Sequence, residues 1–409
     1  MNIYDLIVIG GGPSGIFSAI NVAMANKKVL LIEKNNRIGK KLLVAGQGKC
    51  NLTNGAELKD FFSKYGDKGK FLKTSLYSFT PENLIQWFSK NGLPLELIPE
   101  SNKYFPNTFK SSDVIDLLEK QCNKYNVQLM TSCEAINVAH IDNLFFVKSS
   151  CGEFTAKNLL ISTGGKSYPG TGTTGDGYTF AKSLGHKVIE SHPCLTPVYV
   201  DNYAFTDLSG ISFKSVEVTI FRENKIIDKN IGDLLLTHHN LSGPAVIDLS
   251  RSIRKKDTLK INFLKVPKEQ FNKEIIEFVS EKGKLPVKAF INKYSLPERF
   301  IKKFSTLFNI NFDKKAAELS KSEREALLKL CDYNFTVTKL GDFNIAMATN
   351  GGVDTAEVNP KTMESKIVKS LYFTGEVLDI DGDTGGFNIQ AAFSTGYLAA
   401  QSIVKQSFG

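Results

Sequence analysis

Three glycines near the start of the chain have the spacing of a dinucleotide-binding turn. Gly10 ends the apolar run 4–10, and Gly12 and Gly15 open a stretch with helical periodicity. In such a turn the first glycine permits a sharp bend, the second lets the backbone approach a pyrophosphate, and the third lets the helix pack on the strand. The free N–H groups and the positive dipole at the start of the helix also favour phosphate. The glycines therefore predict a bound dinucleotide.

Glu33 supplies a carboxylate where this kind of site needs one. It ends the second apolar run, "KVLLIE", and it follows Gly15 by 18 residues. A carboxylate at that place can accept hydrogen bonds from both hydroxyls of an adenosine ribose. The same negative charge disfavours a 2′-phosphate, so the sequence argues against an NADP-type nucleotide at this position.

A glycine-rich stretch near the other end of the chain indicates that the dinucleotide is FAD. The apolar run "LYF" delivers Gly375 and Glu376 to a ribityl chain, and Gly385 and Gly386 open a last helix. The positive end of that helix could stabilise negative charge on N1 and O2 of reduced flavin. The segment "STGG", residues 162–165, leaves bare backbone where the chain crosses back near a pyrophosphate.

The segment "GQGKCNLTN", residues 46–54, raises three alternatives: a phosphate loop, a redox thiol or a turn. A P-loop requires glycine where Leu43 stands and serine or threonine where Cys50 stands, so that match fails. The next cysteine is Cys122, so no local dithiol is available. We expect a donor-rich loop that closes over FAD, with Cys50 as a small neighbour of the flavin.

The elements that must position these residues follow an α/β pattern at both ends of the chain. Strand, turn, helix and strand fill residues 4–33, strand signals dominate 195–264, and 267–330 is helical and rich in lysine. This order predicts one nucleotide-binding domain built from both ends, with inserted material between. No second G-x-G-x-x-G follows a strand, so a separate NAD(P)H domain is not expected.

Composition narrows the class of protein. Apolar residues make up 42% and charged residues 23% of the 409, and no apolar run is long enough to span a membrane, so we expect a cytoplasmic protein. The six cysteines have no metal-ligand spacing, and no metal is expected. Residues 255–329 hold 18 basic and 10 acidic residues, which accounts for +8 of the net charge of +9. This segment is either a solvated helical face, the favoured interpretation, or a surface for nucleic acid.

The chain resembles the BaiN-like, or aminoacetone-oxidase-like, family of FAD flavoproteins. The matching motifs are "GGGPSG", "GKKLLVAGQGKCNLTN", "TGGKSYPGTGTTGDGYTFAKSLGH", "LLTHHNLSGPAVIDLS" and "GEVLDIDGDTGGFNIQAAFSTG", spread over residues 8–398. The resemblance implies a Rossmann-type FAD-binding domain in two pieces, 1–190 and 340–409. It also implies a β-barrel-like insert, 191–265 and 331–339, which carries a lysine-rich helical subdomain at 266–330.

The resemblance also implies which positions bind the cofactor. The ADP half, the pyrophosphate, the adenine and the flavin would be held by a set drawn from several segments: Gly10, Gly12, Pro13, Ser14, Gly15, Glu33, Lys34, Lys41, Gly48, Cys50, Asn51, Thr53, Ala135, Thr163, Gly164, Gly165, Glu376, Gly386, Phe387 and Asn388. Ala135 would contact adenine through its backbone, and the last four would hold the ribityl chain and the isoalloxazine ring.

The function predicted from these features is an FAD-dependent oxidoreductase that transfers hydride between flavin N5 and a small organic substrate. NAD(P)H is a candidate donor that visits transiently, and O₂ is a candidate acceptor. His238, in "LTHHNLSGP", is a candidate acid/base, although a structural histidine is the more common case at a strand end. Two alternatives stay open: an RNA-acting flavoprotein that uses the basic segment 255–329, and a flavin redox module without turnover. Substrate, donor and oligomeric state are not determined by the sequence.

Overall fold

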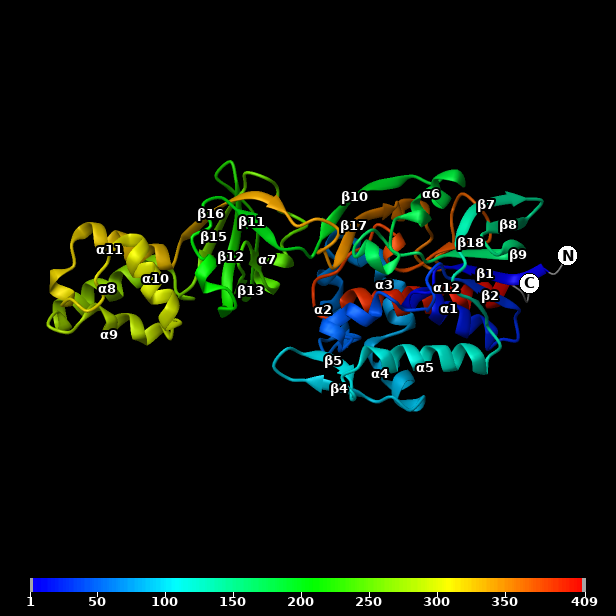
Figure 1. The fold of residues 1–409 in the computed structure, drawn as a ribbon, viewed down its shortest axis with the longest axis horizontal. Helices are drawn as coiled ribbons and strands as arrows, with labels where there is room; N and C mark the ends of the chain where they lie inside the picture. Colours follow the sequence, from blue (N-terminus) through cyan, green and yellow to red (C-terminus); the bar gives the residue numbers. More distant parts are fainter. Residues whose placement is uncertain (1–2, 407–409) are drawn as a thin grey trace. The chain divides into compact units, whose positions relative to one another are not determined.

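Both ends of the chain contribute to one structural unit (Figure 1). The computed structural model describes residues 3–406. They divide into two units, residues 3–194 with 343–406, and Leu195–Asp342, each with its own hydrophobic core. The chain leaves the first unit on β10 (Val188–Cys194) and returns on β17 (Ala348–Val353). These two strands are antiparallel, with Cys194 opposite Ala348, so the second unit is inserted at one place in the first.

A mostly parallel sheet forms the centre of the first unit. Its parallel strands run in the order β6 (Gln128–Met130), β2 (Val29–Ile32), β1 (Ile3–Ile9), β9 (Gly152–Ile161) and β18 (Leu371–Phe373). Antiparallel β8 (Leu144–Ser149) also pairs with β9, and β7 (Ala135–Ile141) pairs with β8. Ile7 of β1 lies opposite Leu30 on one side and Leu159 on the other. A strand paired on both sides and covered on both faces is a continuous apolar run, which explains the sequence of β1.

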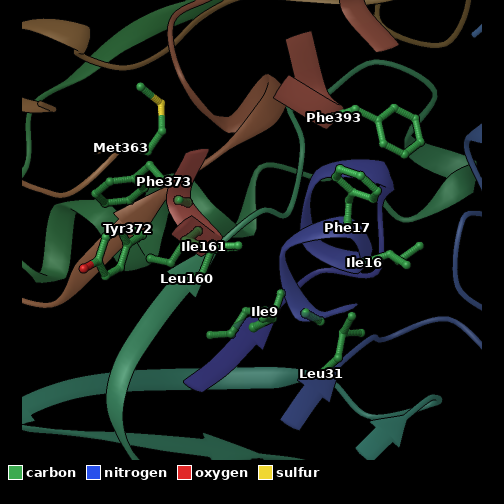
Figure 2. Close-up of a cluster of buried hydrophobic side chains, with 14 of the residues drawn as sticks. Ile9, Ile16, Phe17, Leu31, Leu160, Ile161, Met363, Tyr372, Phe373 and Phe393 are labelled. Atoms are coloured by element: carbon green, nitrogen blue, oxygen red, sulfur yellow. The ribbon is translucent and has the colours of Figure 1, made fainter. Parts of the chain in front are cut away.

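Two helices from opposite ends of the chain, α1 (Pro13–Ala23) and α12 (Phe387–Gln406), pack against each other. Phe17 of α1 meets Phe393 of α12 edge-on, with ring centroids 5.1 Å apart (Figure 2). Ser18 Oγ donates to the carbonyl of Gly396 at 2.8 Å, and a Cβ on Gly396 would lie 2.5 Å from the carbonyl oxygen of Ser14. This close approach fixes the start of α1 against the C-terminal segment.

Shorter elements complete the first unit. They are α2 (Leu58–Phe61), α3 (Gly69–Ser78), α4 (Pro81–Lys90), α5 (Ser111–Lys124), α6 (Asp176–Ser183) and a small sheet of β3 (Thr53–Asn54), β5 (Lys103–Pro106) and β4 (Leu95–Ile98).

A closed six-stranded barrel forms the centre of the second unit. Its order is β11 (Val198–Val200), β14 (Leu241–Ser242), β13 (Lys225–Leu236), β12 (Ser212–Arg222), β15 (Thr258–Asn262) and β16 (Tyr333–Leu340), and β16 pairs back to β11. The helices of this unit are α7 (Pro244–Ile247), α8 (Lys268–Lys282), α9 (Val287–Ile291), α10 (Glu298–Phe308) and α11 (Lys321–Leu327).

Phe300 joins the helices to the barrel. Its ring centroid lies 4.8 Å from those of Phe213, on β12, and Phe263, just after β15. The barrel and the helices therefore share one core, and their division into separate subdomains stays a proposal. The predicted architecture, a Rossmann-type α/β unit in two pieces with an inserted β-barrel, is confirmed. No helix within residues 3–406 is both long and apolar enough to cross a membrane.

Candidate cofactor-binding site

The carboxyl ends of four parallel strands bring the predicted cofactor residues together. Gly10 follows β1, Glu33 follows β2, Thr163 follows β9 after one residue, and Glu376 follows β18 after two residues. In open α/β sheets, ligands bind at this edge. The strand order makes the edge continuous, because β1 lies between β2 and β9, and β9 pairs with β18.

The turn between β1 and α1 has the backbone conformation that its glycines predict. Gly10 has φ +105°, and a Cβ there would lie 2.6 Å from the carbonyl oxygen of Ser162. A Cβ on Gly15 would lie 2.2 Å from the carbonyl oxygen of Gly10. Gly12 is the N-cap of α1, with no side-chain cap and with Pro13 as first helical residue. The start of α1 therefore offers backbone N–H groups to an anion at the sheet edge.

Glu33 is buried and held in place by backbone groups. Its Oε2 accepts from the N–H of Gly11 at 2.7 Å, and its Oε1 accepts from the backbone and side-chain nitrogens of Asn35 at 2.8 and 2.6 Å. A carboxylate has about four acceptor sites, so these bonds orient the group and leave capacity for a ribose hydroxyl. Cys133, two residues before Ala135, donates its N–H to the carbonyl of Glu33 at 3.0 Å, which places the start of β7 near this carboxylate.

Two predicted residues make other contacts. Lys34 Nζ contacts Thr174 Oγ1 at 2.6 Å and Asp176 Oδ2 at 2.5 Å, so it ties the end of β2 to the start of α6. Ser14 Oγ donates to the carbonyl of Thr374 at 3.3 Å. Contact of either side chain with a cofactor stays a prediction.

Lys41 and Glu376 form an ion pair at the site. Lys41 Nζ lies 2.7 Å from Glu376 Oε2 and 2.5 Å from Ser167 Oγ. The other carboxylate oxygen of Glu376 accepts from the N–H of Thr349 at 2.8 Å. Both charged residues were predicted as cofactor contacts, but their pairing was not. Ser167 and Thr349 are not among the residues that the sequence predicts: Ser167 lies in a quoted motif without a role assigned to it, and Thr349 stands in none of the quoted motifs.

The loop after Lys41 contains several residues in the left-handed region. Gly48 has φ +85° and Cys50 has φ +61°. The N–H of Cys50 donates to the carbonyl of Ala45 at 2.9 Å, which closes the turn. The Cys50 side chain is fully buried, and this desolvation raises the pKa of its thiol to about 12. The thiol is therefore protonated at neutral pH, which makes it a poor nucleophile.

The end of this loop is fastened to the start of α12. With its amide oriented so that both ends are satisfied, Asn51 accepts from the N–H of Gly386 at 2.9 Å and donates to the carbonyl of Thr53 at 2.9 Å. Thr53 Oγ1 donates to Gln390 Oε1 at 2.7 Å. Gly386 has φ +94°, and a Cβ there would lie 2.7 Å from the backbone of Thr53. The two motifs that the sequence placed over the flavin are thus in direct contact.

Phe387 and Asn388 support the turn that precedes α12. Phe387 is buried against Phe61, with ring centroids 4.9 Å apart, and its carbonyl accepts from the hydroxyl of Tyr65 at 2.9 Å. The amide of Asn388 exchanges two hydrogen bonds with the backbone of Gly382, at 2.7 and 2.8 Å. These contacts set the position of the helix start, and any contact with flavin stays a prediction.

The segment after β9 fits close to the same edge. Gly164 has φ +72°, and a Cβ on Gly165 would lie 2.4 Å from Thr349 Oγ1. Thr163 Oγ1 and Thr374 Oγ1 are buried and, within the described chain, have no hydrogen-bond partner. Buried hydroxyls without a partner are uncommon in native proteins, which is consistent with polar groups that are completed by another molecule.

These observations fit FAD. The uncapped start of α1 suits the pyrophosphate, Glu33 suits the adenosine ribose, and the start of α12 lies against the Asn51 loop where the resemblance places the flavin. FAD bound there would supply hydride transfer at N5.

His238 lies in the other unit. It is exposed on the turn between β13 and β14, and its ring centroid lies 6.2 Å from that of His239. Within residues 3–406 its side chain has no hydrogen-bond or ion-pair partner, and its acid/base role stays a prediction.

Comparison with known proteins supports the cofactor assignment. The family model described as "HI0933-like protein Rossmann domain" matches residues 4–402. The chain is 31% identical to a ribosomal RNA dihydrouridine synthase of Haemophilus influenzae, with 98% of each chain covered. It is 30% identical to the Escherichia coli protein of the same name, with 99% of each covered. It is 28% identical to a 3-dehydro-bile acid Δ(4,6)-reductase of Clostridium scindens, with 98% of each covered.

Solved structures of low sequence identity share the fold of this chain. The open form of a flavocytochrome c3 fumarate reductase matches with a TM-score of 0.55 and 16% identity, over 100% of this chain and 79% of the other. The full-length family match confirms the family predicted from the motifs, together with FAD as cofactor and an oxidoreductase class. The chain belongs to the HI0933-like family of FAD-dependent Rossmann-fold flavoproteins.

Proposed function

We propose that this chain is an FAD-dependent reductase of a carbon–carbon double bond conjugated to a carbonyl, and that its substrate is a uracil base in ribosomal RNA. The observation that carries the proposal is the match, over nearly the whole of each chain, to two relatives named ribosomal RNA dihydrouridine synthase. Dihydrouridine is uridine whose C5–C6 bond has been reduced, and that bond is conjugated to the C4 carbonyl.

The third relative supports the same type of reaction. A 3-dehydro-bile acid with double bonds at positions 4 and 6 is also a carbonyl compound with conjugated unsaturation. Hydride addition to the far end of such a system places negative charge on the carbonyl oxygen, and a proton must then be supplied. Relatives with different substrates thus share a reaction that suits reduced flavin.

The chain's own residues would orient the cofactor for this reaction. The bonds of Asn51 and Thr53 to the start of α12 hold the segment 46–54, called the flavin loop from here on, against the helix N-terminus. The positive end of that helix favours the reduced, negatively charged flavin and so raises its tendency to accept hydride from a donor. We propose NAD(P)H as the donor. It would reach the flavin transiently, because the sequence has no second nucleotide-binding glycine motif.

The composition of the chain and its relatives favour different classes of substrate. The sequence favours a small organic substrate and a solvated basic segment, whereas the 30–31% relatives favour RNA. A small conjugated ketone is the second candidate, and the 28% relative supports it.

Two half-reactions distinguish these candidates. The FAD-loaded protein is reduced anaerobically with NADPH or NADH, and the flavin absorbance is then followed after mixing with unmodified ribosomal RNA or with a 3-keto-4,6-diene steroid. The proposal predicts reoxidation by RNA and formation of dihydrouridine. Reoxidation by the steroid alone would replace it with the second candidate. If neither the RNA nor the steroid reoxidises the flavin, both candidate substrates are excluded.

A further inference from the structure

A group of four basic side chains lies on the barrel of the second unit. Three of them, Arg254, Lys255 and Lys256, occupy the turn before β15, and the fourth, Lys339, is near the end of β16. We infer that this group, the barrel basic patch, binds the phosphate backbone of the RNA substrate. The inference rests on the proposed function, because it takes RNA to be the substrate.

Backbone hydrogen bonds hold the turn and β16 together. The N–H of Lys256 donates to the carbonyl of Val337 at 2.9 Å, and the N–H of Val337 donates to the carbonyl of Asp257 at 2.8 Å. Lys339 is two residues further along the same strand. Its Nζ lies 4.8 Å from the ring centroid of Tyr199 on β11, the strand that closes the barrel. The four charges are therefore carried by a closed barrel rather than by a free loop.

The positive charge of the patch is not neutralised by carboxylates. All four side chains are exposed, and none has an ion-pair partner within residues 3–406. The acid in the turn, Asp257, is buried and takes two hydrogen bonds from Arg222, both at 2.9 Å. Asp201, whose N–H donates to the carbonyl of Thr336 of β16, accepts from Asn202 with both carboxylate oxygens and, within residues 3–406, forms no ion pair with any of the four cations. The patch is thus free to attract anions.

The helices of the same unit differ from the patch because some of their lysines form ion pairs. Several of their lysines are paired with acids, as Lys293 is with Glu274 and Lys314 with Glu323. Lys282, Lys284, Lys315 and Lys321 are exposed and, within residues 3–406, form no ion pair either, so they match the patch in charge but lie on the helical part of the unit. The lysines of the helices are therefore partly paired with acids, whereas none of the four cations of the patch is.

Four uncompensated cations on a rigid surface suit a polyanion with regularly spaced charges. Each phosphate contact releases condensed counterions, so the affinity for single-stranded nucleic acid falls with salt by a slope of about 0.7 per contact. An acidic protein segment lacks this regular spacing. The ring of Tyr199 restricts Lys339 and lowers the entropy lost on binding.

The test compares two variants that lose the same charge. In the patch variant, Arg254, Lys255, Lys256 and Lys339 are replaced by Gln; in the control, Lys282, Lys284, Lys315 and Lys321 are replaced by Gln. Oxidised, FAD-loaded proteins are titrated with fluorescein-labelled oligouridylate and with labelled ribosomal RNA fragments over a series of salt concentrations. FAD content and melting temperature verify that each variant is folded.

The inference predicts that the patch variant loses about 3 from the slope of log affinity against log salt, at about 0.7 for each of four contacts, and that the control loses much less. An unchanged slope in the patch variant, or an equal loss in the control, would overturn it. Binding of labelled polyglutamate as tightly as oligouridylate would also overturn it.

Dihydrouridine formation is measured separately. If RNA binding depends on the patch but no dihydrouridine forms, only the proposed reaction fails; if dihydrouridine forms and binding ignores the patch, only this inference fails.

Discussion

Lys41 Nζ and Glu376 Oε2 lie 2.7 Å apart, although 335 residues separate them in the sequence. The pair joins the loop after β2 to the turn after β18, and each side chain keeps only about a quarter of its surface exposed, 24% and 21%. It thereby connects the two pieces of chain that the motifs place on opposite parts of one cofactor. Its loss should affect FAD binding more than folding.

Replacing Glu376 with Gln keeps the shape of the side chain and removes the charge. We expect the Kd for FAD to rise roughly tenfold, equivalent to about 1.4 kcal/mol, because Lys41 then lacks its partner. The Kd is measured by quenching of flavin fluorescence on titration into the apoprotein. The control is Lys157→Gln, which removes the more exposed pair with Asp5 in the same unit. Equal FAD affinity in both variants would show that the pair has no role in binding.

Gly386→Ala tests the contact between the flavin loop and α12. The substitution adds a Cβ that would lie 2.7 Å from the backbone of Thr53, at φ +94°. Gly92→Ala is the matched control, because Gly92 has φ +91° and nothing within 4 Å of an added Cβ. The backbone penalty, about 1–2 kcal/mol, is common to both variants. We expect a lower melting temperature and weaker FAD binding in Gly386→Ala beyond those of Gly92→Ala; identical values would contradict the close packing.

The thiol of Cys50 should be inert. Its burial raises its pKa to about 12, whereas Cys151 is exposed. On brief treatment of the folded protein with iodoacetamide, mass spectrometry of the peptides should find Cys151 alkylated and Cys50 unmodified. Cys50→Ser should keep FAD and its reduction by NAD(P)H. Loss of flavin reduction in that variant would give Cys50 a redox role that the structure does not support.

His186 should make stability depend on pH. It is buried, with Nδ1 3.1 Å from Glu357 Oε2 and Nε2 2.8 Å from Ser365 Oγ. Burial outweighs the attraction of Glu357 and lowers the pKa of His186 below its ordinary value of 6.5. The neutral ring is therefore favoured in the folded state, and its contribution is present above about pH 6.5 and is lost as the pH falls through the folded pKa.

The measurement compares the melting temperatures of wild type and His186→Asn between about pH 7.5 and about pH 5.5. We expect wild type to be the more stable at the higher pH and the gap to narrow as the pH falls. A gap that widens on acidification would mean that the charged ring is the stabilising form.

The sequence predicts features that depend on residues close together in the chain better than features that depend on distant pairings. The glycine turn and Glu33 lie within one strand–helix–strand stretch, where spacing alone sets their relation, and the structure holds both at one sheet edge. The barrel was expected only through the family resemblance, since its closure pairs Val198 with Leu340. Such pairings have no local periodicity to reveal them.

The partners of the site residues were least predictable. The sequence does not indicate that Lys34 pairs with Asp176, or that the amide of Asn388 bonds with Gly382. A motif predicts which residues surround a cofactor, but hydrogen bonds between distant segments depend on how the folded chain places them. The barrel basic patch is a further case, because net charge identifies a basic segment without showing which cations are neutralised by neighbouring acids.

One anaerobic single-turnover measurement shows whether reduced flavin on this chain reduces uracil in RNA, as we propose. FAD-loaded protein reduced with NADPH is mixed with ribosomal RNA that lacks dihydrouridine, and the nucleosides are quantified by mass spectrometry after digestion. We expect about one dihydrouridine per flavin reoxidised, and none when the protein stays oxidised. Flavin that remains reduced in the presence of the RNA, with no dihydrouridine formed, would contradict it.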